Sequence, residues 1–253
     1  MRNLGPADRS APRRATIEGR ALGWLIWTLV LAAAGCGSPE PPPPAATTAV
    51  ATAGDPRPLE PASPIASRPR IVFLGDSLTA GLGLDLDESV PSLMQASLEA
   101  RGYPHQVVNA GVSGDTSAGG LSRLDWSLEG DVEVLVVELG ANDGLRGLPV
   151  PAMKRNLDEI ITRAKARGIT VLLTGMEAPP NFGPAYTAEF RQVFRDLAEA
   201  HQVELVPFFL DGVAGIPALN LPDGIHPNPE GARIIHANLW RALEPLLAGP
   251  AGS

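Results

Sequence analysis

Three residues of this chain have the side-chain types that acyl transfer by a serine requires. Ser77 lies in residues 75–78, Gly-Asp-Ser-Leu, directly after a short apolar run, and Asp223 and His226 stand three positions apart far downstream. A serine hydroxyl becomes a nucleophile when a base removes its proton and a third group orients that base. We therefore interpret Ser77 as a nucleophile, His226 as its base, and Asp223 as the carboxylate that fixes the histidine tautomer.

The same chemistry needs hydrogen-bond donors for the negative charge that develops on the substrate oxygen. The candidates are the backbone N–H groups of Ser77 and Gly114 and the side-chain amide of Asn142. One such asparagine donor typically contributes about 3–4 kcal/mol of transition-state stabilisation. We predict that these three groups form an oxyanion hole.

Each of these residues also has a purely structural interpretation. Gly-Asp-Ser is a common turn sequence, and Gly114 could be a turn glycine before a capped helix. Asn142 could satisfy its own backbone in a loop, and His226 could be a surface residue before a proline. All four motifs nevertheless occur together, in the chain order expected for a serine hydrolase and at the ends of predicted strands. Such a combination is improbable by chance, so it favours the catalytic interpretation.

The elements that must position these residues begin at residue 70. Short, nearly continuous apolar runs are typical of strands buried on both faces, and they cover residues 71–74, 106–109, 132–139, 170–173 and 204–207. Helical patterns separate them, at about residues 90–101, 116–124, 152–167, 185–201 and 229–247. This alternation predicts an α/β fold with a five-stranded parallel sheet and helices on both faces.

A parallel sheet brings the candidate residues together. Ser77 follows the first predicted strand, Gly114 the second and Asn142 the third. Ligands of such sheets bind beyond the carboxyl ends of the strands. We therefore expect all three residues at one edge of the sheet.

The first 69 residues differ in character. Residues 1–36 have a basic start, a short apolar stretch and small residues before Cys36, the pattern of a secretory signal with a lipoprotein-like end. Lipidation of Cys36 would tether the protein to a membrane; an ordinary cleaved signal or an uncleaved anchor are the alternatives. Residues 37–69 are rich in Pro, Ala and Thr and predict a disordered linker before a folded domain at 70–249.

Composition excludes several other classes. The formal net charge is −8, which argues against a nucleic-acid partner. A single cysteine excludes an intrachain disulfide and a Cys-rich metal site. Hydrophobic residues make up 44% of the chain, enough for a buried core.

The motifs resemble those of the GDSL or SGNH hydrolase family, whose four blocks carry a serine, a glycine, an asparagine and a histidine. Here the blocks match residues 75–78, Gly114, residues 140–143 and residues 223–226, and the resemblance extends over residues 70 to about 247. It is strongest to the bacterial branch of arylesterases, acyl-CoA thioesterases and lysophospholipases. An α/β-hydrolase fits less well, because Thr79 stands where its Gly-x-Ser-x-Gly motif needs the second glycine.

This resemblance implies a three-layer α/β/α fold like that of flavodoxin, with no metal and no cofactor. It implies hydrolysis of esters or thioesters through an acyl-enzyme. In the related branch the loop at residues 177–184 borders the acyl chain, so Phe182 and Tyr186 are candidate acyl-binding residues; core packing or a stiffened connection is the alternative. The residues after Asn142 could shape the same groove: Asp143, Leu145 and Arg146.

We therefore expect a monomeric serine hydrolase in the periplasm or cell envelope of a bacterium. We expect a lipid anchor at Cys36, because the only cysteine of the chain stands directly after the small residues of the signal pattern. Its substrates would be small-molecule esters, thioesters or lysophospholipids. Two alternatives remain at this point: a carbohydrate O-acetyl esterase of the cell envelope, and a non-catalytic lipoprotein that binds lipid.

Overall fold

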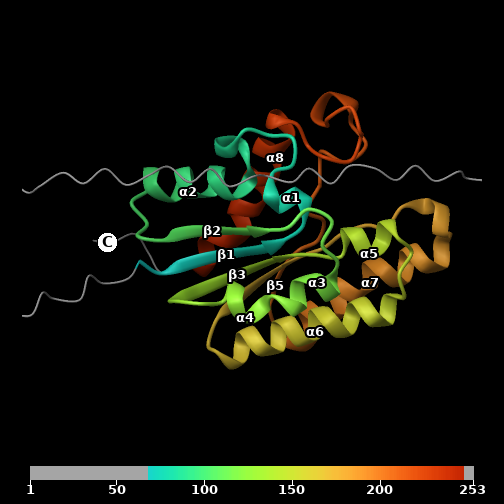
Figure 1. Ribbon diagram of the computed structural model, residues 1–253, viewed down its shortest axis with the longest axis horizontal. Helices are drawn as coiled ribbons and strands as arrows, with labels where there is room; N and C mark the ends of the chain where they lie inside the picture. Colours follow the sequence, from blue (N-terminus) through green and yellow to red (C-terminus); the bar gives the residue numbers. More distant parts are fainter. Residues whose placement is uncertain (1–67, 248–253) are drawn as a thin grey trace, which may run out of the picture. The chain divides into compact units, whose positions relative to one another are not determined.

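A five-stranded, entirely parallel sheet organises the protein, and its strand order is β2-β1-β3-β4-β5 (Figure 1). The computed structural model describes residues 68–247. The strands are β1 (Arg70–Gly75), β2 (Gln106–Gly111), β3 (Val132–Glu138), β4 (Thr170–Thr174) and β5 (Glu204–Val206). Each of the five predicted strands is present within two residues of its expected ends, and the predicted α/β fold is confirmed.

Helices cover both faces of this sheet (Figure 1). One face carries α2 (Val90–Ala100) and α8 (Pro229–Leu243), which contact each other. The other face carries α3 (Ser117–Ser122), α4 (Leu124–Ser127), α6 (Val150–Ala166) and α7 (Pro184–His201). The fold is thus the expected three-layer arrangement.

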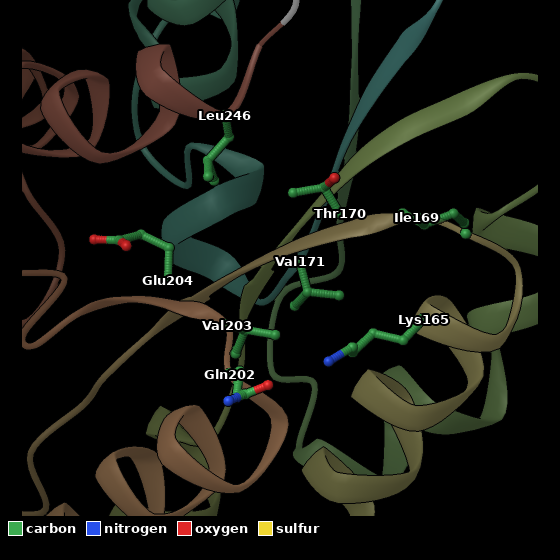
Figure 2. A pocket seen from close by; sticks show the side chains of 9 residues that line it. Lys165, Ile169, Thr170, Val171, Gln202, Val203, Glu204 and Leu246 are labelled. Carbon is green, nitrogen blue, oxygen red and sulfur yellow. The ribbon is translucent and has the colours of Figure 1, made fainter.

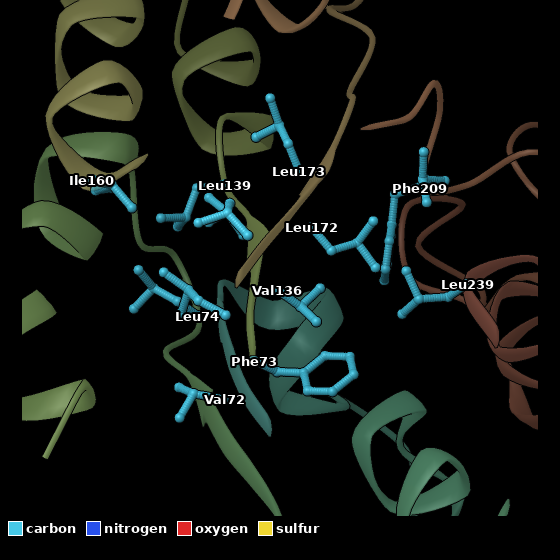
Figure 3. Packing of buried hydrophobic residues seen from close by; sticks show 14 of the residues in the cluster. Val72, Phe73, Leu74, Val136, Leu139, Ile160, Leu172, Leu173, Phe209 and Leu239 are labelled. Atoms are coloured by element: carbon cyan, nitrogen blue, oxygen red, sulfur yellow. The ribbon is translucent and has the colours of Figure 1, made fainter. Parts of the chain in front are cut away.

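The core lies between these layers because alternate strand residues point to opposite faces. Val72 and Leu74 of β1 point towards one helix layer, and Phe73 points towards the other (Figure 3). All three side chains are buried, as are Ile160 of α6 and Leu239 of α8. Aliphatic packing on both faces holds the strand ends, and therefore the loops that follow them, in place.

Several predicted helix bounds change in the structure. The single helix expected at residues 116–124 is two short helices, α3 and α4, which meet at Arg123. Helix α6 begins at Val150 because Pro151 fits its first turn, and α8 begins after Asn228, whose side chain caps it as expected.

The remaining helices are short, and the sequence predicts none of them as a separate element. They are α1 (Ser77–Ala80), α5 (Ala141–Leu145) and the 3₁₀ turns η1 (Leu86–Glu88), η2 (Pro180–Phe182), η3 (Pro217–Leu219) and η4 (Glu244–Leu246). They are too short to show a hydrophobic period in the sequence. Of these elements, η4 lies within the helix predicted at residues 229–247.

The predicted signal segment, Cys36 and the predicted linker up to residue 67 lie outside the described residues. The last two linker residues already belong to the folded part. Arg68 donates hydrogen bonds to the carbonyls of Pro104 and His105, and the Pro69 carbonyl accepts from Gln106. Between residues 68 and 247, no helix has the length and apolar character needed to cross a membrane.

Substitution of Gly111, the last residue of β2, tests how closely β2 packs against α1. A Cβ at this position would lie 2.3 Å from the Ala80 nitrogen and 2.8 Å from the Ala80 Cα. Backbone atoms cannot move aside easily, so Gly111→Ala should lower the free energy of unfolding by about 3 kcal/mol in urea denaturation.

Gly102→Ala is the matched control for Gly111→Ala. A Cβ at Gly102 would meet no atom within 4 Å, and only its φ of +77° is unfavourable for alanine. The control should lose about 1 kcal/mol. Equal losses in the two variants would contradict the close packing of Gly111 on α1.

Candidate active site

The elements that carry the candidate residues follow the ends of β1, β2 and β3, and Figure 1 shows α1 and α5 at this end of the sheet. Helix α1 begins with Ser77 just after β1, the turn with Gly114 follows β2, and α5 with Asn142 follows β3. His226 arrives from a different direction, in the loop before α8. The sheet edge therefore collects residues from four separate parts of the chain.

Ser77 is placed by a sharp change from strand to helix. Gly75 ends β1, Asp76 caps α1, and the Asp76 Oδ1 accepts a hydrogen bond of 3.0 Å from the Leu78 N–H. Helix α1 ends after one turn at Gly81, which has a left-handed conformation with φ of +79°. This turn leaves the Ser77 side chain at the edge of the sheet, facing the His226 loop.

Ser77, His226 and Asp223 form a continuous hydrogen-bonded chain. The Ser77 Oγ lies 2.8 Å from His226 Nε2, and His226 Nδ1 lies 2.7 Å from the Asp223 Oδ2. A proton on Nδ1 leaves Nε2 free to accept from the serine hydroxyl. This geometry is the one required of a nucleophile, a base and an orienting carboxylate.

The loop that carries His226 is tied to its neighbours by backbone hydrogen bonds. The His226 carbonyl accepts from the Leu221 N–H at 2.7 Å, and Asn220 forms an antiparallel bridge with Pro227. The buried Asn220 amide also donates to the carbonyls of Val213 and Ile216, both at 2.8 Å. The histidine is therefore held on an ordered loop.

Asp223 is ionised at every pH at which a histidine is neutral. Its pKa is lowered to about 2, first by the His226 backbone N–H, then by the Ile225 N–H and by the His226 ring. Because the pKa lies below the ordinary value for aspartate, the carboxylate is lost only when the pH falls towards 2. It can thus stabilise a protonated His226 over the whole range in which histidine titrates.

The three proposed oxyanion donors lie beside Ser77. The backbone N–H groups of Ser77 and Gly114 donate to no other group within the described part of the chain. The Asn142 Nδ2 donates one hydrogen bond, of 2.9 Å, to the Asp76 Oδ2, and keeps a second N–H. All three residues line the same cleft, so the donors can serve one oxygen atom.

Two arginines that sequence reasoning did not identify as structural fix this arrangement. The Arg123 guanidinium donates to the carbonyls of Gly75 and Ala110, at 2.9 and 2.7 Å, and to Asp115 at 2.7 Å. It thereby ties the ends of β1 and β2 to the residue after Gly114. On the other side, Arg146 Nη2 donates to the Gly114 carbonyl at 2.8 Å.

Beneath Ser77 lies a buried pair of carboxyl groups, Asp76 and Glu138. Glu138 Oε2 accepts hydrogen bonds from Thr79 Oγ1, at 2.8 Å, and from the Asp76 N–H, at 3.3 Å. Burial raises the pKa of both carboxyl groups, and the charge on Asp76 raises the pKa of Glu138 further. Gly75 makes room for the hydrogen bond between Thr79 and Glu138, because a Cβ there would lie 2.0 Å from Thr79 Oγ1 and 2.7 Å from Glu138 Oε2.

A cleft of about 750 Å³ opens beside Ser77 and His226. Most of its remaining wall is apolar: Leu82, Leu145, Met176, Ala178, Pro179, Pro180, Phe208, Leu210 and Ile225. The volume lies in the range of small-molecule sites. The loop after β4 borders this cleft, as expected, through residues 176–180.

Of the five predicted substrate-binding residues, Leu145 lines the cleft, whereas the other four have contacts outside its wall. Asp143 is buried and accepts from the Ser117 N–H and hydroxyl, at 2.8 and 2.7 Å, so it joins α5 to α3. Arg146 is engaged with the Gly114 carbonyl, as described above.

The two predicted aromatic residues support the neighbouring loop instead of the cleft. Phe182 and Tyr186 pack against each other with ring centroids 5.3 Å apart. The Tyr186 hydroxyl donates to the Leu148 carbonyl at 2.9 Å, and the Phe182 ring lies against Gly147.

A second cavity, of about 340 Å³, lies at the opposite edge of the sheet, where β4 and β5 begin (Figure 2). Thr170, Val171, Val203 and Glu204 line it, together with Lys165, whose ammonium group donates to the His201 carbonyl. None of the motif residues contributes to it. Within residues 68–247, no three His, Cys, Asp or Glu side chains are placed to bind a metal ion.

Asp223→Asn tests whether Asp223 controls the His226 tautomer. The asparagine oxygen can still accept from the backbone N–H groups, but its NH₂ group cannot accept from Nδ1. Covalent labelling of Ser77 by a fluorophosphonate should slow by about 10²–10⁴-fold while the melting temperature stays close to that of the parent chain. The exposed Asp87→Asn is the matched control, and an equal labelling rate in Asp223→Asn would contradict the assignment.

Comparison with known proteins agrees with this geometry. Residues 73–234 match the model of the GDSL-like Lipase/Acylhydrolase family. Esterase TesA of Pseudomonas aeruginosa is 44% identical over 178 residues, which are 70% of this chain and 89% of that protein. Thioesterase 1/protease 1/lysophospholipase L1 of Escherichia coli K12 is 35% identical over 178 residues, 70% of this chain and 84% of that protein.

Solved structures give the same result. The crystal structure of TesA has a TM-score of 0.68 at 44% identity and covers 70% of this chain and 99% of its own. AlinE4, an SGNH-hydrolase family esterase, has a TM-score of 0.60 at 40% identity and covers 73% of this chain and 100% of its own. The chain therefore belongs to the GDSL-like lipase/acylhydrolase family, with the fold of an SGNH hydrolase.

Proposed function

We propose that this protein hydrolyses carboxylic esters and thioesters through an acyl-enzyme on Ser77. The observation that carries this proposal is the hydrogen-bonded chain from Ser77 Oγ through His226 to Asp223, at the edge of an apolar cleft. Similar proteins are named esterase, arylesterase and thioesterase 1/lysophospholipase L1, which supports the same class of reaction.

In the first half of the reaction, Ser77 Oγ attacks the carbonyl carbon of the substrate while His226 Nε2 takes the serine proton. The carbonyl oxygen becomes an oxyanion, which accepts from the Ser77 and Gly114 N–H groups and from the Asn142 amide. The imidazolium then donates its proton to the leaving alcohol or thiol as the bond to the carbonyl carbon breaks. The acyl group remains on Ser77.

In the second half, water takes the place of the leaving group. His226 removes a proton from the water, which attacks the acyl carbon, and the same donors stabilise the second oxyanion. Collapse of this intermediate returns the proton to Ser77 Oγ and releases the carboxylic acid. Asp223 stays ionised throughout, since its pKa is about 2.

The cleft favours substrates with an apolar acyl group. Its walls include Leu145, Ala178 and Pro180, and its volume of about 750 Å³ far exceeds the size of an acetyl group. Burial of acyl carbons against such walls contributes about 0.8 kcal/mol for each methylene group. We therefore favour esters of medium or longer acyl chains, including lysophospholipids, over carbohydrate O-acetyl groups.

The first test is hydrolysis of p-nitrophenyl esters from acetate to decanoate by the full-length protein. Ser77→Ala should lower kcat by about 10⁴–10⁶-fold, because the nucleophile is removed. The value of kcat/KM should rise from acetate to the middle of the series as the acyl chain fills the cleft. Surface variant Asp87→Asn serves as control.

Other outcomes of this experiment favour other functions. Activity confined to acetate would favour the O-acetyl esterase. Absence of activity at all chain lengths in the folded protein would favour a lipid-binding lipoprotein. Equal activity in Ser77→Ala and the parent chain would refute Ser77 as the nucleophile.

We also propose that the protein acts in the bacterial cell envelope and is anchored by lipid at Cys36. The basic, apolar and small-residue pattern of residues 1–36 supports this location, as does the Pro-rich segment that would carry the enzyme away from the membrane. A lipid anchor would hold the enzyme at the membrane, where lysophospholipid substrates are found.

Cys36→Ala tests this anchor in a bacterial host. The parent protein should partition with membranes and carry a lipid mass on its N-terminal cysteine, whereas the variant should be found in the soluble fraction. Hydrolytic activity should be equal in both, because residues 70–247 are unchanged. A soluble, unmodified parent protein would instead indicate an ordinary cleaved signal.

A further inference from the structure

The carboxyl group of Glu138 has no role in the proposed reaction, yet it lies completely buried beneath the nucleophile turn. Its Oε2 accepts from Thr79 Oγ1 and from the Asp76 N–H, and its Oε1 is buried without any N–H or O–H donor. An ionised carboxylate with an oxygen in this state would be costly, because burial penalises charge that hydrogen bonds do not satisfy. A protonated carboxyl would turn the same position into a donor.

The acceptor for such a donor is the neighbouring Asp76. Its carboxylate accepts from the Leu78 N–H at 3.0 Å and from the Asn142 amide at 2.9 Å, and its backbone N–H donates to Glu138 Oε2 at 3.3 Å, which places the two carboxyl groups side by side. Two carboxyl groups can share a hydrogen bond only if one of them holds a proton. Asp76 has the donors that favour a negative charge, so Glu138 is the better place for the proton.

We propose that Glu138 stays protonated at neutral pH and is a positioning residue, which holds the Asp76 carboxylate so that Asp76 orients the Asn142 amide towards the oxyanion. Three donors then surround Asp76: Glu138 O–H, Leu78 N–H and Asn142 Nδ2. Asn142 presents nitrogen to Asp76 and keeps its second N–H for the substrate. With Glu138 neutral, only one negative charge lies under the site in which the oxyanion forms.

This inference rests on the proposed function for its kinetic consequence, whereas the position of the proton does not depend on that function. Infrared spectroscopy of the full-length protein at pH 7 tests the proton directly. The parent protein and Asp76→Asn should show the C=O stretch of a protonated carboxyl group, and Glu138→Gln should lack it. The exposed Glu159→Gln is the matched control and should keep the band. Absence of the band in the parent protein, or its persistence in Glu138→Gln, would overturn the proposal.

Kinetics test the positioning role. In Glu138→Gln the amide can donate to Asp76 and accept from Thr79, so kcat should stay within about threefold of the parent value. In Glu138→Leu the donor is lost and Asn142 is free to turn, so kcat should fall by about 10- to 100-fold with KM little changed. Each kcat is divided by the fraction of Ser77 that a fluorophosphonate labels at completion, which corrects for misfolded protein.

The outcomes separate the two proposals. Equal kcat in Glu138→Leu and the parent protein, or equal losses in the leucine and glutamine variants, would overturn the positioning role of Glu138. Full activity in Ser77→Ala would instead overturn the proposed function, and the infrared result would still decide where the proton resides.

Discussion

The hydrogen bond between Ser77 Oγ and His226 Nε2 joins residues 149 positions apart, and the rest of the site depends on it. It forms because parallel strands end at the same edge of the sheet, so that α1 after the first strand meets the loop before the last helix. The bond is 2.8 Å long and lies over a core packed on both faces. Loss of that packing would move the nucleophile away from its base, because neither loop is held in place by the hydrogen bond alone.

Several charged residues near the cleft hold the backbone of its loops in place. Arg123 binds the carbonyls at the ends of β1 and β2, Arg146 binds the Gly114 carbonyl, and Asp143 binds Ser117. An oxyanion hole depends on donors that are fixed before the reaction, because reorganisation would consume the energy that they supply. These hydrogen bonds keep the loops after three different strands in fixed relative positions, and the cleft walls themselves are largely apolar.

Stability and function conflict beneath Ser77. Two carboxyl groups, Asp76 and Glu138, are buried where an aliphatic pair would pack more favourably, and Gly75 has no side chain because a Cβ would collide with Thr79. Proteins keep such arrangements at functional sites and compensate for them elsewhere. Here the compensation is the aliphatic core on both faces of the sheet, in which Leu74, Val136 and Leu172 are completely buried.

The amino-acid sequence by itself determined the strand–helix alternation, the parallel sheet and the edge at which Ser77, Gly114 and Asn142 meet, because hydrophobic period and turn residues are local properties. It also placed Asp223 and His226 within reach of each other. Only the tertiary structure decided what a polar side chain near the cleft does. Asp143 and Arg146 bind to neighbouring loops, and Glu138, which lies in an apolar run of the sequence, accepts from the Asp76 N–H. Such roles depend on partners brought from distant segments, and spacing along the chain does not encode them.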